Sequence, residues 1–159
     1  MDIIYLDFRK AFDLVPHNKL ELKLKNHGIE GNVLKWIKEW LNDRKQRVVI
    51  NGANSEFVNV TSGVPQGSVL GPVLFLIYIN DLDANIINNI AKFADDTKLS
   101  APSHNTTSCE SLQTDLNNIL NWSKIWEMEF DIAKCKYLHI GNNNINFTYT
   151  MNFTYTTII

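Results

Sequence analysis

The sequence is poor in cysteine, proline and glycine and has no long apolar run. Its 159 residues include two cysteines, four prolines and seven glycines. Two cysteines are too few for a four-cysteine zinc site or a disulfide scaffold, which indicates a reducing compartment and inert thiols. The low proline and glycine content excludes collagen-like and linker composition. A membrane-spanning helix would need a stretch of about 18 apolar residues, and the sequence has none.

What the chain does contain is enough apolar material for one folded domain. Hydrophobic residues make up 45% of the sequence and charged residues 20%, which excludes disorder and coiled coil as descriptions of the whole. The N-terminus enters an apolar strand pattern without a basic segment or a cleavage site. We therefore expect a nuclear or cytoplasmic protein that is not secreted.

Charge is distributed unevenly along the chain. The net charge is -2, which argues against a uniformly basic nucleic-acid binder. Residues 9–47 carry ten Lys or Arg against five acids, whereas residues 48–159 carry five basic and ten acidic side chains. A basic part joined to an acidic part suits a protein that holds a phosphate backbone with one and metal cations with the other. An ordinary solvated surface has the same composition, so both interpretations stay open.

Hydrophobic periodicity predicts a mixture of strands and helices. The segment Asn18–Asn26 is ambiguous, because Leu20, Leu22 and Leu24 alternate as in a strand while the first and last of them also suit a helix, which we favour. The other expected elements are a buried strand (Ile3–Phe8), a helix (Asn32–Leu41), two neighbouring strands (Arg47–Ile50 and Phe57–Val60), a loop (Thr61–Gly71), a helix apolar on nearly all sides that ends at Leu82, a hairpin (Ile90–Leu99), a long helix (Leu112–Trp126) and a last strand (Tyr137–Ile140).

Three acidic residues stand where the hydrophobic pattern does not explain them. Asp7 ends an apolar strand, and Asp95 and Asp96 lie at the tip of the expected hairpin. Clustered carboxylates repel one another and are costly to desolvate, so divalent cations usually stabilise them. Oxygen ligands favour magnesium over zinc, and two such ions about 4 Å apart support in-line nucleotidyl transfer. However, Asp-Asp is also a common surface dipeptide.

The residues around these acids resemble three ordered motifs of reverse transcriptases. The runs are YLDFRKAFD (Tyr5–Asp13), SGVPQGSVLGP (Ser62–Pro72) and FADD (Phe93–Asp96), in the order and spacing of motifs A, B and C. The residues within these motifs are similar to those of the non-LTR (LINE-type) retrotransposon class, and the resemblance extends over residues 1 to about 151. The resemblance implies an RNA-directed DNA polymerase that transfers nucleotides from dNTPs to a primer 3' hydroxyl by a two-metal mechanism.

The same resemblance implies roles for the residues of the first and third motifs. Asp7, Asp95 and Asp96 would be the catalytic, metal-binding triad, with the Phe8 carbonyl as a backbone ligand. The metal would be Mg²⁺, with Mn²⁺ as a substitute. Lys134 stands where the family has a lysine that protonates the pyrophosphate leaving group, although a mobile solvated lysine is an equally good interpretation.

A nucleotide-binding set is also implied. Phe12 matches a position where an aromatic ring clashes with a ribose 2' hydroxyl and so favours deoxynucleotides; the alternative is a core phenylalanine. Gly63, Pro65, Gln66 and Gly67 would form a loop against the incoming nucleotide and the template, because glycine lets backbone approach closely and glutamine offers both a donor and an acceptor.

The implied fold is α+β, a polymerase palm with a small antiparallel sheet and helices packed on one face. Residues 1–141 would form this palm fragment with motifs A to D. Residues 142–159, in which Asn-Phe-Thr-Tyr-Thr occurs at Asn146 and again at Asn152, would form an irregular low-complexity tail.

The implied partners are an RNA template, a DNA primer and dNTPs, and not a membrane. Fingers, thumb and endonuclease regions of the parent polyprotein are largely missing, so we expect the chain alone to be inactive. Glu21 occupies a position where the family is expected to have an apolar residue, a hint of a decayed copy. The alternatives are a non-catalytic remnant that binds nucleic acid through residues 9–47 and an inert transposon fragment.

Overall fold

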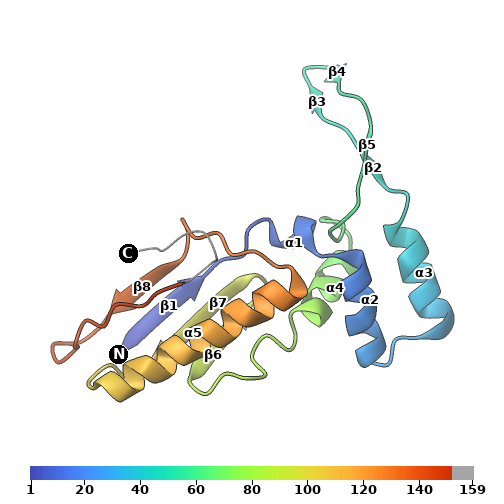
Figure 1. Ribbon diagram of the computed structural model, residues 1–159. Helices are drawn as coiled ribbons and strands as arrows, with labels where there is room; N and C mark the ends of the chain where they lie inside the picture. The colour runs from blue at the N-terminus through green and yellow to red at the C-terminus, as the bar shows by residue number, and fades with distance from the viewer. Residues whose placement is uncertain (152–159) are drawn as a thin grey trace. The chain divides into compact units, whose positions relative to one another are not determined.

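The computed structural model describes residues 1–151, which divide into two compact units. One unit consists of Met1–Ala11 and the chain from Asn80 onward, and the other consists of Phe12–Ile79. Helices and strands are mixed along the chain in an α+β arrangement (Figure 1). None of the helices within residues 1–151 has the length and apolar character needed to cross a membrane.

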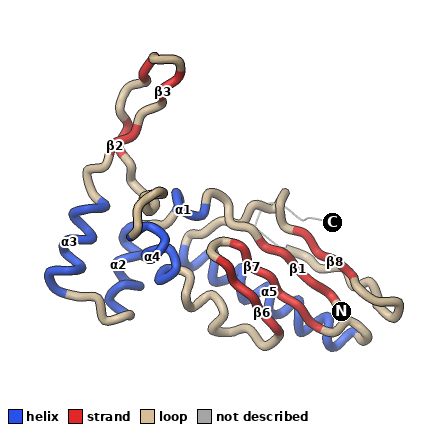
Figure 2. The backbone as a smooth tube through the Cα atoms, turned by 180° about the vertical axis from the view of Figure 1, so that it is seen from behind, coloured by secondary structure: helices blue, strands red, loops and turns tan. Residues whose placement is uncertain are grey.

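The first unit is built on a four-stranded antiparallel sheet in the order β6-β7-β1-β8 (Figure 2). Its inner strand β1 pairs with β7 on one side and β8 on the other, so the strand predicted at the N-terminus is paired along both edges. The antiparallel sheet confirms the α+β prediction. The strands are β1 (Asp2–Leu6), β6 (Asn89–Phe93), β7 (Asp96–Ala101) and β8 (Lys136–His139).

One face of this sheet packs against a long helix, α5 (Thr106–Trp126). Burial alternates along β7: Thr97, Leu99 and Ala101 are buried, whereas the residues between and before them are more exposed. Alternating strand residues point to opposite faces, so the buried set faces the helix. The apolar spacing of the helix supplies the other half of this core, with Leu112, Leu116, Ile119 and Leu120 buried.

The second unit combines helices with an extended hairpin. α1 (Ala11–Leu14) leads into it, followed by α2 (His17–Asn26), α3 (Gly31–Leu41) and, after the hairpin, α4 (Leu70–Tyr78). The helical interpretation of the ambiguous leucine segment is confirmed. Leu20 and Leu24, four residues apart as on one face of a helix, are buried, whereas Leu22 between them is 53% exposed.

The hairpin of this unit extends away from α2 and α3 as two short ladders (Figure 1). The strands predicted over 47–50 and 57–60 are right in kind and wrong in their bounds. The ladders are separated where the Val48 N–H donates to the Ser55 hydroxyl instead of to a backbone carbonyl (2.9 Å). The first ladder pairs β2 (Lys45–Gln46) with β5 (Val58–Asn59), and the second pairs β3 (Val49–Ile50) with β4 (Ala53–Asn54).

The prediction for α4 is also wrong in part. The helix ends at Tyr78 and not at Leu82, because the chain continues through Asn80 and Asp81, residue types that favour turns. One side of the helix is open, since Val73 is 46% and Leu76 52% exposed. An apolar run therefore predicted a helix correctly but not its length or its burial.

Glu21, which stands where an apolar residue is expected, has a defined place in this unit. Its carboxylate forms ion pairs with Lys25 on the same helix (2.9 Å) and with Lys38 on α3 (2.8 Å). Hydrogen bonds from Lys38 and Lys25 lower the pKa of Glu21. The residue thus ties α2 to α3, which is a structural use of the charge and not only a sign of decay.

A buried carboxylate at the start of β1 fastens the segment that follows β8. Asp2 is fully buried and accepts hydrogen bonds from the Tyr149 hydroxyl (2.7 Å), the His139 ring and the Asn144 amide. Burial opposes ionisation of Asp2, but these hydrogen bonds outweigh burial and lower its pKa. Burial and the bond to Asp2 raise the pKa of Tyr149. Residues 142–151 form no helix or strand, and this network holds them; the second copy of the repeat, at Asn152, lies outside the described residues.

We expect the substitution Tyr149→Phe to lower the free energy of unfolding by about 1–3 kcal/mol at pH 7, because it removes a donor to a buried carboxylate. The lowered pKa of Asp2 means that its contribution is present above the ordinary value of 3.8 and is lost as pH falls through the folded-state pKa. The deficit of the variant should therefore shrink at acid pH. Urea unfolding at pH 7 and pH 3 measures this, with Tyr137→Phe as the control; an equal loss in both variants would refute the role of the network.

Candidate active site

The register of β1 on β7 brings Asp7 to the hairpin that carries Asp95 and Asp96. The last pair of this ladder is Leu6 with Thr97. One further step in the same register puts Asp7 opposite Asp96. Residues opposite one another on antiparallel strands have Cβ atoms about 4.5–5.5 Å apart. Asp7 and Asp96, from distant parts of the chain, therefore lie at the same end of the sheet.

Asp95 lies in the tight turn between β6 and β7. The pair Phe93 with Asp96 closes the ladder, which leaves Ala94 and Asp95 as the two turn residues. Ala94 has a φ of 52°, a left-handed conformation that costs a residue with a Cβ roughly 1–2 kcal/mol. The flanking strand pairs hold this turn, and so they hold Asp95 beside Asp96 at the end of the sheet.

The Phe8 carbonyl points toward the same edge of β1 as these acids. The Asp7 carbonyl accepts from the Asp131 N–H (2.8 Å), and the Arg9 N–H donates to the Glu129 carbonyl (2.7 Å). Backbone groups of successive strand residues point to opposite sides of the strand. The Phe8 carbonyl, between these two, is thus directed away from 129–131 and toward the side on which β7 pairs with β1.

Lys134 supplies a positive charge beside Asp7. Its ammonium Nζ lies 3.4 Å from both carboxylate oxygens of Asp7 and 4.0 Å from Asp131. The same acids affect the neighbouring Cys135. Burial raises the pKa of its thiol, and the negative charges of Asp7 and Asp131 raise this pKa further. Cys135 is accordingly a protonated thiol at neutral pH.

The three acids offer only oxygen ligands, the donor type that Mg²⁺ prefers. Within residues 1–151 no three His, Cys, Asp or Glu side chains converge on one point as a formed metal site. Asp7 is 28% exposed at its side chain and paired with a lysine that is 59% exposed. The donor set suits a magnesium ion, and this surface ion pair is weak enough for a divalent cation to displace.

The predicted nucleotide-binding residues belong to the second unit, where the loop before α4 is anchored on α1. The Gln66 amide donates to the Asp13 carboxylate (3.0 Å), and the Ser62 hydroxyl donates to the Asp13 carbonyl (2.8 Å). Phe12 is half-buried with its ring stacked on Phe75 of α4, 4.4 Å between centroids. Phe12 is thus a residue of α1, and Gln66 is hydrogen-bonded to the same short helix.

Gly63 lets this loop approach α1 more closely than any other residue could. It has a φ of +83°, and a Cβ built on it would lie 2.6 Å from the Asp13 carbonyl oxygen. Its N–H donates to the Val15 carbonyl (2.8 Å). The backbone that Gly63 admits here is that of Phe12 and Asp13; its predicted contact with the nucleotide and template stays a prediction. Gly67 has a φ of +81° but no atom within 4 Å of such a Cβ.

His17 and Arg44, which the sequence did not single out, contact the carbonyl of the same glycine. The Gly63 carbonyl accepts from the Arg44 guanidinium (2.7 Å) and lies 2.8 Å from the His17 ring nitrogen. Burial lowers the pKa of Arg44, which also donates to the Leu41 carbonyl (2.9 Å). No local pattern signals these contacts, because Arg44 reads as one of several charges in a basic run.

Comparison with known proteins gives this arrangement a family. Residues 3–156 match the family described as reverse transcriptase (RNA-dependent DNA polymerase). The chain is 32% identical over 151 residues to a probable RNA-directed DNA polymerase from transposon X-element of Drosophila melanogaster, which covers 91% of this chain and 16% of that protein. It is 30% identical over 147 residues to the RNA-directed DNA polymerase from mobile element jockey of the same organism, covering 87% of this chain and 16% of that protein.

The chain thus spans 16% of the length of these curated relatives. Among solved structures, the fold is similar to that of apo telomerase from Candida tropicalis truncated from its C-terminal domain, with a TM-score of 0.64 and 15% sequence identity. That match covers 99% of this chain and 33% of the other. At such low identity the likeness shows the fold alone.

The close approach at Gly63 makes a specific prediction. Gly63→Ala should lower the free energy of unfolding by at least about 2 kcal/mol more than Gly52→Ala, because the added methyl overlaps backbone. Gly52 is the matched control, since it has the same φ of +83° and nothing within 4 Å of its Cβ position. Chemical denaturation of both variants measures the difference. Equal losses would mean that backbone conformation alone accounts for the effect.

Proposed function

Because the chain belongs to the reverse transcriptase (RNA-dependent DNA polymerase) family, with relatives among non-LTR elements, we propose that it is the palm region of an RNA-directed DNA polymerase. Its proposed substrates are an RNA template, a DNA primer and dNTPs. In the reaction, the primer 3' hydroxyl attacks the α-phosphorus of the dNTP, a new phosphodiester bond forms, and pyrophosphate leaves. Fingers, thumb and endonuclease regions would come from other parts of a longer polyprotein.

The observation that supports this proposal is the register of β1 on β7, in which the last pair is Leu6 with Thr97, the residues next to Asp7 and Asp96. We assign these three carboxylates and the Phe8 carbonyl to the binding of Mg²⁺, or of Mn²⁺ in its place. The metal, when bound, would favour ionisation of the primer hydroxyl and neutralise charge on the phosphoryl oxygens. The part of the protein is to hold the ligands at the end of an inner strand, since β1 is paired on both sides.

Lys134 is proposed to serve the leaving group. Its ammonium lies 3.4 Å from the Asp7 carboxylate, close enough to the acidic edge to donate a proton to the departing pyrophosphate. The long lysine side chain is 59% exposed, so it can exchange its carboxylate partner for a phosphate. In the absence of metal, the same charge offsets the repulsion among the acids.

The anchored loop of the second unit is proposed to contact the nucleotide. We assign Phe12 to exclusion of the ribose 2' hydroxyl, supported by the stacking on Phe75 that fixes its ring. Gln66 is assigned to hydrogen bonds with the nucleotide or template, and its bond to Asp13 holds it in place. Gly63, Pro65 and Gly67 would shape the backbone of this loop.

The metal assignment is tested on the purified chain with Mn²⁺ as the probe. We expect weak binding, detected by enhanced relaxation of water protons and reversed by excess Mg²⁺. Asp7→Asn and Asp95→Asn should each weaken it by at least about tenfold, because each removes a charged ligand. Asp43→Asn makes the same charge change on α3's C-terminal side and should leave binding unchanged. Retention of the parent signal in both site variants would exclude this site.

Lys134 gives an independent test in the opposite direction. Lys134→Gln should strengthen Mn²⁺ binding at least roughly fivefold, because two unit charges about 4 Å apart repel by about 1 kcal/mol even in water and Mn²⁺ carries two charges. Lys124→Gln, an exposed lysine on α5, removes the same charge elsewhere. If both lysine variants shift binding equally, only net charge matters and Lys134 does not face the metal site.

A further inference from the structure

One face of the projecting hairpin gathers cations, an aromatic ring and an amide. Lys45 pairs with Asn59, and Gln46 with Val58. Two residues along each strand the same face continues with Arg47 and Phe57, whose contact shows that they lie together: the guanidinium carbon is 4.8 Å from the ring centroid. All four residues of this face, Lys45, Arg47, Phe57 and Asn59, are exposed; we call it the basic face of the hairpin.

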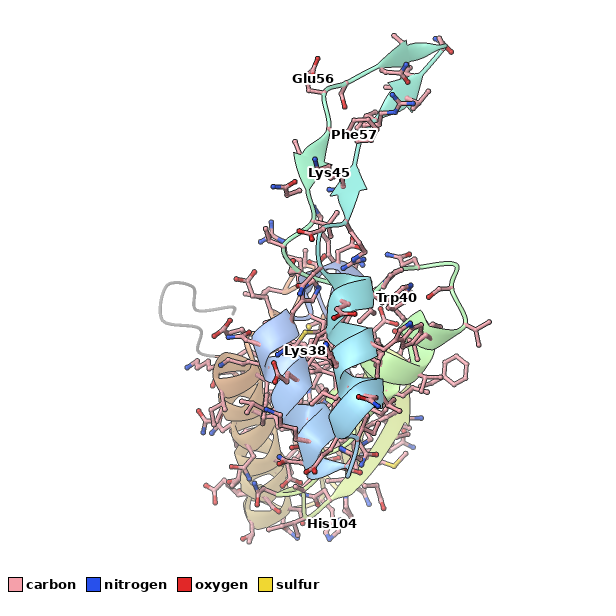
Figure 3. All side chains as sticks on the ribbon, turned by 90° about the vertical axis from the view of Figure 1, so that its right-hand side faces the viewer. Lys38, Trp40, Lys45, Glu56, Phe57 and His104 are labelled. Carbon is pink, nitrogen blue, oxygen red and sulfur yellow. The ribbon has the colours of Figure 1, made fainter. Side chains whose placement is uncertain are left out.

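The opposite face has a different chemistry. Val58 is 54% exposed and Val48 60%, and both alternate with residues of the basic face. Glu56, the acid of this hairpin, is adjacent to Phe57 and so points to the other side. Figure 3 labels Lys45, Glu56 and Phe57 along the hairpin, beyond the ends of α2 and α3. The two cations therefore stand on the face opposite to Glu56.

Phe57 is not a core residue of this hairpin. Its side chain is 59% exposed, and the Arg47 guanidinium covers one side of the ring. The arginine fixes the ring and leaves its other side open to a flat group. Unpaired nucleic-acid bases stack on such rings, and flanking cations neutralise the phosphates of the strand.

We propose that the basic face of the hairpin is a binding site for a single-stranded stretch of nucleic acid. A base stacks on the open side of Phe57, Lys45 and Arg47 contact phosphates, and Asn59 hydrogen-bonds a base or sugar edge. The hairpin extends from the helices of its unit (Figure 1), and each of its β-strands has only two residues. A nucleic-acid strand can therefore reach either face of the hairpin, but the cations lie on only one of them. This inference rests on the proposed function, since a polymerase must hold strands outside its metal site.

The test uses the whole chain and three fluorescein-labelled probes: a 12-mer of uridine, a 12-mer of deoxythymidine and a 12-base-pair duplex. Fluorescence anisotropy at several salt concentrations gives affinity and salt dependence. Lys45→Gln with Arg47→Gln should weaken single-strand binding and reduce the salt slope by about 1.4, because each phosphate contact contributes about 0.7 for single strands. Phe57→Leu should weaken binding roughly fivefold or more through lost stacking.

Matched controls keep the experiment specific to this face. Lys35→Gln with Lys124→Gln removes the same charge from α3 and α5, and Val58→Ala alters the opposite face; both should bind as the parent does. The single-stranded probe, RNA or DNA, whose affinity falls more in the hairpin variants identifies the nucleic acid that the hairpin binds. Circular dichroism establishes that each variant is folded.

Several outcomes would overturn the proposal. The first is equal weakening by the control and hairpin lysine variants; the second is duplex binding as tight as that of either single strand. The third is self-association of the chain that Val58→Ala abolishes, without binding of any strand, because the hairpin would then dock protein. If the hairpin variants bind strands like the parent while Mn²⁺ binding persists, the hairpin site fails and the proposed polymerase function stands.

Discussion

The acidic edge of this protein depends on a single backbone register, that of β1 on β7. A slip of one residue would turn every β1 side chain to the other face of the sheet and carry Asp7 toward the core under α5. Burial prevents the slip, because Ile4 and Leu6 on β1 and Leu99 on β7 are almost fully buried. Apolar packing on one face of the sheet thus decides where carboxylates gather at its end.

Asp2 and Asp7, the two aspartates of the first strand segment, illustrate how surroundings separate structure from chemistry. Asp2 is buried, and its hydrogen bonds from Asn144 and Tyr149 tie residues 142–151 to the sheet, while His139 donates to it from β8. Asp7 forms an ion pair with an exposed lysine, Lys134, at 3.4 Å, and that lysine also lies 4.0 Å from Asp131. Asp2 is thus a buried carboxylate that stabilises the fold, whereas Asp7 is partly exposed and paired with an exposed lysine that a ligand can displace. This contrast supports the metal-binding role proposed for Asp7.

Local periodicity predicted the elements well where only local contacts decide them. The strand predicted at Ile3–Phe8 appears as β1 (Asp2–Leu6), and the hairpin around Asp95 and the long helix α5 also appear, because alternation and helical spacing record which side is buried. The bounds were wrong where a side chain competes for backbone groups, as Ser55 does with Val48, or where turn-forming residues end an apolar run, as at Asn80. Of the candidate site, the sequence indicated the acids and the Gln66 loop, but not the contacts of Arg44 and His17 with Gly63.

By itself the sequence determined which residue types are present and in what order, and three ordered motifs were enough to indicate a reverse transcriptase, which the family match bears out. Tertiary structure alone decided that the β1–β7 ladder ends with Leu6 and Thr97, next to Asp7 and Asp96, that the Phe8 carbonyl is directed away from residues 129–131, and that Gly63 admits the backbone of Asp13. The reason is physical: periodicity reports the environment of neighbouring residues, whereas a cross-strand register or a close backbone approach is set by the packing of segments far apart in the chain.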